Sequence, residues 1–274
     1  MASLAGAFAA SHGPLIIREW EAVPTAQKER MTAAFRELGR RVMAAKPDVL
    51  IVVSPDHWSN FFLDNIPSVC LGVGETNEGP PEAWMKGFPH REIPGDPELA
   101  MHIARTALAE GFEPSFSHRL KLDHGTCIPL WRMGVEPLPR IVPMIVNSIE
   151  APLPSVRRCY EWGALLARAI RTYPEDIRVA IVGTGGLSHS IGEPTMGTID
   201  EPFDIECIER FKGSTAKLFT FLEEKLPKTG NGAEEVRNWL VAHGAAGGRG
   251  FELVDYLPVP AVIVGCGFAA WRIA

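Results

Sequence analysis

The sequence predicts an α/β fold with a central, largely parallel mixed sheet covered by helices on both faces. Two short apolar runs rich in β-branched residues, at 49–53 and 179–182, are typical of buried strands. Amphipathic segments at 27–45 and 155–172 alternate with these runs, and this alternation indicates a parallel sheet. We expect one domain over residues 1–274, because this length suits one large α/β domain and no linker or repeat interrupts it.

The remaining elements continue the alternation. Residues 5–10 are apolar and predict a strand, and a second apolar run at 66–73 precedes a loop rich in Gly, Pro and Glu at 74–97. Asp96 and Pro97 are typical of a helix start, because aspartate caps the first turn and proline fits the first helical position. Later segments predict a strand at 141–146, helices at 204–226 and 233–243, and a closing strand at 259–264.

Composition and charge exclude several classes of protein. The net charge is -6 and the chain has no run of Lys or Arg, so we expect no nucleic-acid partner. No segment approaches the roughly 20 apolar residues that cross a bilayer, so we expect no membrane partner either. The five cysteines are scattered and lack C-x-x-C spacing, which disfavours a disulfide framework and favours a reducing cytoplasm.

Four of the eight histidines stand where a predicted strand or turn has just ended. They are His12, His57, His124 and His189. Ligands of open α/β sheets collect at the carboxyl ends of the strands, so His12 and His57 can meet at neighbouring strand ends. Two imidazoles and one carboxylate would form a metal site with open positions. The other four are interpreted as surface or packing residues, namely His90, His102, His118 and His243.

Spacing alone leaves the carboxylate open between Asp56, Asp123, Glu234 and Glu235. Glu235 shares a helical face with Trp239, so a packed tryptophan would point Glu235 inward. A buried carboxylate is costly unless a positive charge compensates it, and a metal ion would do so. The alternative is that both glutamates only stabilise the first helical turn through the helix dipole.

The glycine-rich residues 183–186 do not predict a nucleotide site. They lack the G-x-G-x-x-G spacing and a phosphate-binding lysine. Glycine here favours close approach of the backbone to a ligand beneath His189. Without a G-x-S-x-G motif, Ser188 is not a candidate nucleophile.

Together these motifs resemble those of the class III extradiol dioxygenases, the family of the catalytic subunits of protocatechuate 4,5-dioxygenase and 2-aminophenol 1,6-dioxygenase. The resemblance covers most of the chain and rests on Ser11-His12, Asp56-His57, Asp123-His124-Gly125, Gly183 to His189, and Gly232 to Trp239. It implies non-haem Fe(II) held by His12, His57 and Glu235, since the glutamate of the family stands four residues before the tryptophan.

The resemblance also assigns roles to the residues around the iron. It implies His189 as the catalytic acid/base and His124 as a residue near substrate and oxygen. Asp56 and Asp123 would orient the histidines beside them. The reaction implied is extradiol cleavage of a catechol-type or o-aminophenol-type ring with dioxygen.

Departures from the family pattern bear on the substrate and on partners. Acid-binding relatives have polar groups near the last strand and before the second ligand, where this chain has Pro258-Val259-Pro260 and Pro55. A neutral ring therefore fits better than an acidic one, unless Arg18 or Arg249 reaches the pocket. The expected pocket residues are Thr184, Gly185, Gly186, Pro258, Val259 and Pro260. No segment matches the small lid subunit of the protocatechuate enzyme, so we expect a separate accessory chain or a homodimer.

Two other classes of function compete with the dioxygenase. A zinc hydrolase can use the same His/His/Glu set, although the chain has no H-E-x-x-H motif. A non-catalytic binding protein of the same fold is the other alternative, and the presence of all the presumed ligands disfavours it.

Overall fold

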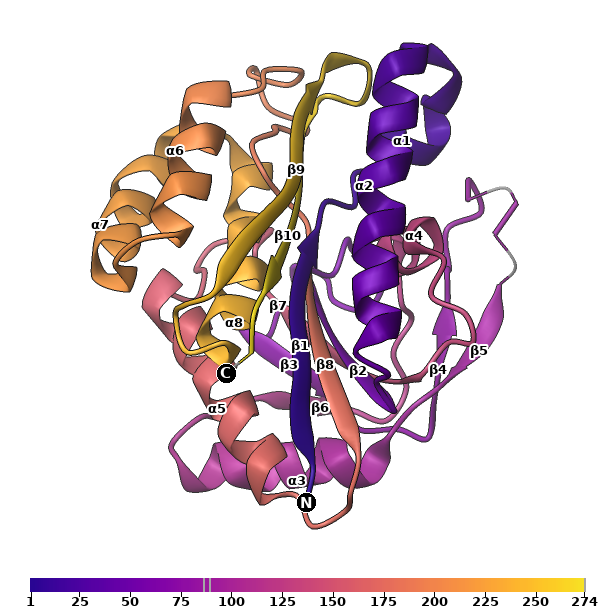
Figure 1. Ribbon diagram of the computed structural model, residues 1–274, viewed down its shortest axis with the longest axis vertical. Helices are drawn as coiled ribbons and strands as arrows, with labels where there is room; N and C mark the ends of the chain where they lie inside the picture. Colours follow the sequence, from indigo (N-terminus) through magenta and orange to yellow (C-terminus); the bar gives the residue numbers. More distant parts are fainter. Residues whose placement is uncertain (86, 89, 274) are drawn as a thin grey trace.

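The computed structural model describes residues 1–85, 87–88 and 90–273, and its centre is an eight-stranded sheet (Figure 1). The strand order is β6-β3-β7-β2-β8-β1-β10-β9, with β4 and β5 in a separate two-stranded sheet. The strands are β1 (Ser3–Ala10), β2 (Val49–Ser54), β3 (Val69–Gly72), β4 (Thr76–Gly79), β5 (Arg91–Pro94), β6 (Ser115–Ser117), β7 (Arg140–Val146), β8 (Arg178–Thr184), β9 (Phe251–Val259) and β10 (Val264–Trp271). The predicted α/β class with a mixed, mostly parallel sheet is confirmed.

Helices cover both faces of this sheet (Figure 1). The α-helices are α1 (Leu15–Arg18), α2 (Thr25–Ala44), α3 (Pro97–Ala109), α4 (His124–Met133), α5 (Val156–Thr172), α6 (Glu201–Phe211), α7 (Thr215–Lys225) and α8 (Val236–Ala245). The short 3-10 helices are η1 (Trp20–Ala22), η2 (Leu226–Lys228), η3 (Asn231–Glu235) and η4 (Pro260–Val262). In the described part of the chain, no helix combines the length and apolar character needed to cross a membrane.

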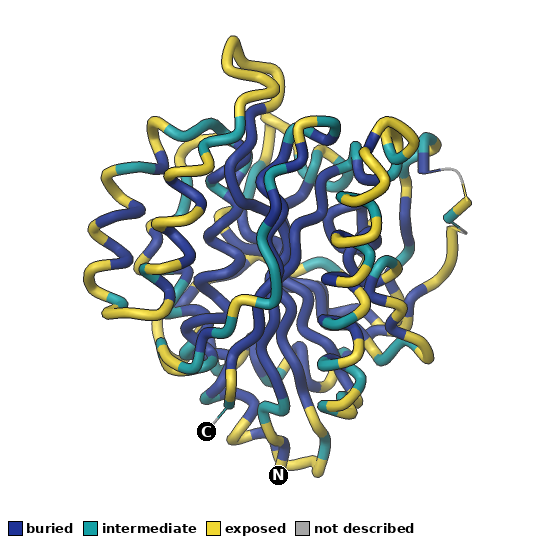
Figure 2. Tube along the Cα trace, turned by 45° about the horizontal axis from the view of Figure 1, so that its top comes forward, coloured by how far each residue is buried: buried dark blue, intermediate teal, exposed yellow. Residues whose placement is uncertain are grey.

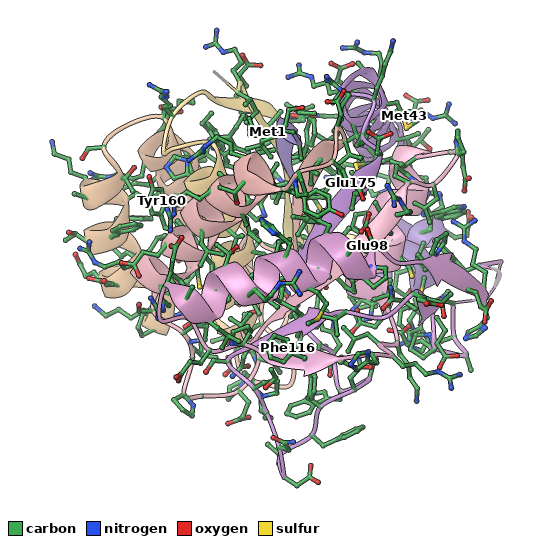
Figure 3. All side chains as sticks on the ribbon, turned by 90° about the horizontal axis from the view of Figure 1, so that it is seen from below. Met1, Met43, Glu98, Phe116, Tyr160 and Glu175 are labelled. Carbon is green, nitrogen blue, oxygen red and sulfur yellow. The ribbon has the colours of Figure 1, made fainter. Side chains whose placement is uncertain are left out.

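The central strands β7, β2, β8 and β1 run parallel to one another. Their carboxyl ends therefore lie at one edge of the sheet, at the upper end of Figure 1. Figure 3 views the opposite end, where Met1 and Glu175 lie. Because β10 is antiparallel to β1, the turn of the β9–β10 hairpin lies at the same end as the residues that follow β1.

Strand β2 separates two hydrophobic cores. Val49, Ile51 and Val53 face the core beneath α3, α5 and α8. Leu50 and Val52 face the core beneath α2 and α4. Burial of each such side chain contributes roughly 1.5–3 kcal/mol, and Figure 2 shows the buried residues concentrated along the strands. The strand ends that carry the histidines are thus set on a rigid support.

The structure differs from the predicted elements in several places. The helix predicted at 204–226 is two helices, α6 and α7, because the chain turns at Gly213 and Ser214 between them. The one predicted at 233–243 begins as the 3-10 turn η3. The loop predicted at 74–97 contains β4 and β5, and neither β6 nor α4 is among the predicted elements.

The closing strand predicted at 259–264 is wrong, because residues 260–263 form the turn between β9, which ends at Val259, and β10, which begins at Val264. Pro260 starts the 3-10 turn η4, where its missing N–H costs no strand hydrogen bond. Ile263 then reverses the chain at a φ of 52°. The apolar composition of the segment thus belongs to a hairpin turn, in which Val262 is buried and Pro260 is exposed.

Candidate metal centre

Three side chains meet at the carboxyl end of the parallel strands with one donor atom each. The Nε2 atoms of His12 and His57 are 3.3 Å apart, and Glu235 Oε1 is 3.3 Å from the former and 3.4 Å from the latter. A point about 2 Å from all three atoms exists at this spacing, which is the bond length typical of divalent metals such as zinc. The three residues can therefore bind one ion together, as in a 2-His-1-carboxylate site.

The ring of His57 is oriented by Asp123. One carboxylate oxygen, Asp123 Oδ2, accepts from the backbone N–H of His57 at 2.7 Å and lies 3.1 Å from its Nδ1. The oxygen acts as an acceptor toward the backbone, so Nδ1 donates to it and Nε2 keeps its lone pair. Burial lowers the pKa of His57, but Asp123 and Glu235 outweigh it and raise this pKa to about 10. The surroundings thus favour a positive charge at Nε2, whether a proton or a metal ion.

Glu235 is the last residue of η3 and is 2% exposed. Its Oε2 accepts from the backbone N–H of Gly186 at 2.7 Å, which leaves Oε1 to face the two histidines. Burial raises the pKa of Glu235, but His12 and His189, together with hydrogen bonds from the ligand histidines, hold it well below its usual range. The neighbouring Glu234 pairs with Arg237 instead.

Two glycines allow this close packing. Gly185 follows β8 with a φ of +108°, and a methyl group there would lie 2.5 Å from Glu235 Oε2 and 2.9 Å from His12 Cε1. A methyl group at Gly232 would lie 2.2 Å from the ring of His189. The backbone therefore approaches the centre in a way that no other residue type allows at these positions.

His189 lies beside the triangle of donor atoms. Its Nδ1 donates to the carbonyl oxygen of Leu187 at 3.0 Å, because a carbonyl can only accept. Its Nε2 lies 3.8 Å from Glu235 Oε2. An imidazole in this position, with its Nε2 lone pair directed to the centre, can take up and return a proton.

His124 is the first residue of α4 and packs against the centre. Its ring centroid is 4.0 Å from that of His57 and 5.7 Å from that of His12. Burial, followed by the charge of His57, lowers the pKa of His124. The four histidines predicted to share a site, His12, His57, His124 and His189, thus gather at one end of the sheet.

Asp56 has a different role from the one predicted. Its carboxylate accepts from the backbone N–H groups of Ser59, Asn60 and Phe61, at 2.9 to 3.2 Å, so it caps the loop after β2 instead of orienting a histidine ring. A carboxylate that the sequence did not predict, Glu82, instead contacts His124.

Asp204 was also missed by the sequence prediction. Its carboxylate accepts from the N–H and the hydroxyl of Ser188, both at 2.8 Å, and from the hydroxyl of Tyr256 at 2.7 Å. It therefore anchors the segment that carries His189. No local motif marks Asp204 or Glu82, because each reaches the centre only through the fold.

The predicted pocket residues lie on two elements at this end of the sheet. Thr184 ends β8, and its hydroxyl is 3.2 Å from His12 Nδ1. Pro258 to Pro260 lie where β9 enters its turn, and the turn reaches the chain after His12, since a methyl group at Gly13 would lie 3.0 Å from Val264.

Of the two arginines considered as anchors for an acidic substrate, Arg18 is the one near the centre. Its guanidinium lies 5.9 Å from the ring of Trp84, which is in turn 5.4 Å from that of His124. Arg249 precedes β9 at the end of the hairpin away from its turn.

Comparisons with known proteins identify a matching family and similar curated proteins. Residues 6–267 match the family described as "Catalytic LigB subunit of aromatic ring-opening dioxygenase". The chain is similar to a 2,3-dihydroxyphenylpropionate/2,3-dihydroxicinnamic acid 1,2-dioxygenase of Klebsiella pneumoniae, with 32% identity over 63% of this chain and 53% of that protein. It is also similar to a gallate dioxygenase of Pseudomonas putida, with 35% identity over 56% of this chain and 47% of that protein. The chain thus spans about half the length of the curated relatives that it matches.

A solved structure shares the fold. The crystal structure of the uncharacterized protein JW3007 from Escherichia coli K12 matches with a TM-score of 0.65 and 15% identity, over 97% of this chain and 99% of that one.

Proposed function

Because the chain belongs to the family of the catalytic LigB subunit of aromatic ring-opening dioxygenase, we propose that it performs extradiol cleavage of a catechol-type or o-aminophenol-type ring with dioxygen. The observation that carries the proposal is the triangle of donor atoms from His12, His57 and Glu235, with sides of 3.3 to 3.4 Å. This donor set is the one that non-haem Fe(II) oxygenases use. When bound, the iron would supply open positions for the two adjacent hydroxyl or amino groups of the substrate and for dioxygen.

The chain itself supplies the proton transfer. The Nε2 of His189 approaches Oε2 of Glu235, whereas the two ligand histidines approach Oε1. From there His189 takes the proton of a substrate hydroxyl and returns it when the ring opens. A general acid/base of this kind contributes ~10²–10⁴-fold to the rate.

The zinc hydrolase and the non-catalytic binding protein are less well supported. Zinc accepts the same three donors, but membership of a ring-opening family favours oxygen chemistry over hydrolysis. A binding protein would have no need of a buried His189 beside the three donors.

We further propose that the substrate ring is neutral. Pro258 and Pro260 offer no side-chain donor at the hairpin turn, and burying an unpaired carboxylate costs several kcal/mol. The relatives named above act on 2,3-dihydroxyphenylpropionate and gallate, both of which carry a carboxylate. An acidic substrate would therefore have to recruit the exposed Arg18.

The test uses protein purified without oxygen and loaded with Fe(II). Oxygen uptake and the absorbance of the ring-cleavage product are measured with catechol, 2-aminophenol, protocatechuate and gallate. We expect turnover with the neutral rings at higher kcat/KM than with the acids. Hydrolysis by the zinc-loaded protein, or no turnover of any ring, would contradict the proposed reaction. A preference for the acidic rings that is lost in Arg18→Gln would contradict only the proposal that the substrate is neutral.

We also propose that the chain works in the cytoplasm as one domain, either as a homodimer or with a small accessory subunit. The five free and buried cysteines support a reducing compartment. The molar mass in solution, measured by light scattering with and without co-purifying chains, tests the assembly.

A further inference from the structure

Glu82 contacts His124 through a single carboxylate oxygen. Glu82 lies between β4 and β5, in a segment that does not belong to the central sheet. Its Oε1 accepts from the backbone N–H of His124 at 3.0 Å and lies 2.6 Å from the ring Nδ1 of the same residue. Both side chains are largely buried, with exposures of 14% and 7%. The contact is thus short, double and shielded from water.

The double contact fixes the direction of the ring hydrogen bond. A backbone N–H can only donate, so Glu82 Oε1 is an acceptor. A carboxylate has no hydrogen to donate, so the ring Nδ1 of His124 carries the hydrogen and Nε2 keeps its lone pair. This Nε2 is buried and has no hydrogen-bond partner among the residues that the structure describes.

His124 offers one ring nitrogen close to the metal centre. One ring nitrogen from each of His12, His57 and His124 lies within 4.8 Å of the others. Because Nδ1 of His124 is bonded to Glu82, Nε2 is the nitrogen left for the centre. A buried, unpartnered acceptor at this place indicates that a ligand of the site completes its hydrogen bonding.

His57 is held in the same way as His124. Asp123 Oδ2 accepts from both the backbone N–H and the ring Nδ1 of His57, and it leaves Nε2 for the metal. The same arrangement of hydrogen bonds thus occurs twice, with Asp123 orienting His57 and Glu82 orienting His124. The Nε2 lone pair of His57 would bind the metal, and that of His124 remains for a group beside the metal ligands.

We propose that Glu82 is a positioning residue that holds His124 with its Nε2 lone pair toward the substrate, where it accepts a hydrogen bond from the hydroxyl or amino group of the ring. This proposal rests on the proposed ring cleavage. It predicts that the substrate must carry a donor at the position facing His124, and that a methyl ether there is rejected. Carboxylates that orient metal-ligating histidines are worth about 10–100-fold in metal affinity or activity, and we expect an effect of the same order for Glu82.

The experiment compares Glu82→Leu, which removes the acceptor, with Glu82→Gln, which keeps an acceptor oxygen. Glu78→Leu is the matched control, because Glu78 lies on β4 and its carboxylate pairs only with the exposed Arg119 among the described residues. The tautomer of His124 is determined by imidazole nitrogen NMR on the metal-free protein. The kcat and KM for catechol are then measured on the Fe(II)-loaded protein.

We expect Nδ1-protonated His124 in the wild type, in Glu82→Gln and in Glu78→Leu, and a mixture of tautomers in Glu82→Leu. The kcat/KM for catechol should fall about 10–100-fold in Glu82→Leu and be largely restored in Glu82→Gln. In the His124→Ala variant, adding Glu82→Leu should not lower kcat/KM further, because the effect of Glu82 passes through His124. If Glu82 had a purely structural role, Glu82→Leu would lower kcat/KM by the same factor in the wild type and in His124→Ala.

Three results would overturn the proposal. The first is an unchanged tautomer in Glu82→Leu, or in Glu82→Ala where the leucine variant does not fold. The second is an additive loss of kcat/KM in the double variant. The third is loss of bound iron in His124→Ala, which would make Nε2 a metal ligand and not an acceptor for substrate. If the wild type cleaves no ring at all, the proposed function fails, while the NMR comparison still decides whether Glu82 sets the tautomer.

Discussion

Replacing Gly185 by alanine should disturb two metal ligands at once. Gly185 directly follows β8 and has a φ of +108°, a region that side chains rarely adopt. The added methyl carbon would lie 2.5 Å from Glu235 Oε2, 2.8 Å from Glu235 Cβ and 2.9 Å from His12 Cε1. Both residues are buried, so neither can move into solvent to relieve the contact.

The size of the effect follows from these distances. Ordinary van der Waals contact begins at 3.4 Å, so the Glu235 carboxylate must shift by roughly 0.9 Å and the His12 ring by roughly 0.5 Å. A misplacement of about 1 Å at an active site costs about 100-fold in reaction rate, and we expect a loss of the same order in metal affinity when two ligands are displaced. The strained backbone also lowers the free energy of unfolding by about 1–3 kcal/mol, and this strain does not itself change the metal affinity.

A matched variant separates strain from displacement. Gly197 has a φ of +92°, lies in an exposed segment, and would place its methyl group no closer than 4.0 Å to the side chain of Ile263. Gly197→Ala therefore carries similar strain without pushing a ligand. Anaerobic calorimetric titration with Fe(II) gives the metal affinity, and thermal unfolding gives the stability.

We expect both alanine variants to be less stable than the wild type, and only Gly185→Ala to bind Fe(II) about 100-fold more weakly. Wild-type affinity in Gly185→Ala would refute the assignment of Glu235 and His12 as ligands held against this backbone. An equal loss of affinity in Gly197→Ala would show that strain alone accounts for the effect.

Three further outcomes are expected. Glu235→Ala should abolish iron binding measured by metal analysis, whereas Glu234→Ala should retain it, and the reverse result would refute the choice of carboxylate. His189→Phe should keep iron and substrate binding but lose ~10²–10⁴-fold in kcat, and unchanged turnover would remove it from the mechanism. Burial raises the pKa of Asp204 to about 7 from 3.8, so its stability contribution is complete at low pH and is lost as the pH rises through about 7. The free energy of unfolding should therefore fall between about pH 4 and about pH 8 by a few kcal/mol more in the wild type than in Asp204→Asn, and parallel profiles would contradict this.

The sequence predicts the parts of the fold whose physics is local. Residues 49–53 are apolar on both alternating faces, and the structure buries them between two cores. Because parallel strands end at one edge, a histidine after β1 and another after β2 could be expected to meet there. They lie 3.3 Å apart at Nε2, although β8 separates the two strands, which are not the neighbours that the sequence suggested. Glu235 could be favoured over Glu234 from the position of Trp239, which is fully buried and donates to the carbonyl of Gly185.

The β9–β10 hairpin could not be predicted in the same way. Its turn falls within a continuous apolar segment, and the residue with positive φ is Ile263, where Gly or Asn is usual. Pro258 and Pro260 are the local signals against a continuous strand, and apart from them residues 259–264 resemble one. Burial of Val262 in the hydrophobic core helps to fix the chain there.

The sequence also fails to predict which carboxylate orients which histidine. In the sequence, Asp56 precedes His57 and Asp123 precedes His124, which suggests that each aspartate orients its neighbour. Successive side chains of an extended chain point to opposite sides, so an adjacent carboxylate is poorly placed to reach the neighbouring ring. Asp123 instead orients His57 from 66 residues away.

The same geometry explains why Glu82 orients His124 across 42 residues. Asp123 turns its other oxygen to the N–H of Gly125 and caps α4, while Asp56 caps the loop after β2. Each adjacent aspartate thus serves the backbone beside its histidine, and the ring is held by a carboxylate from another segment. The carboxylate that sets an active-site tautomer is therefore to be sought among residues that the fold brings across the site, and this is what makes Glu82 the decisive residue to change.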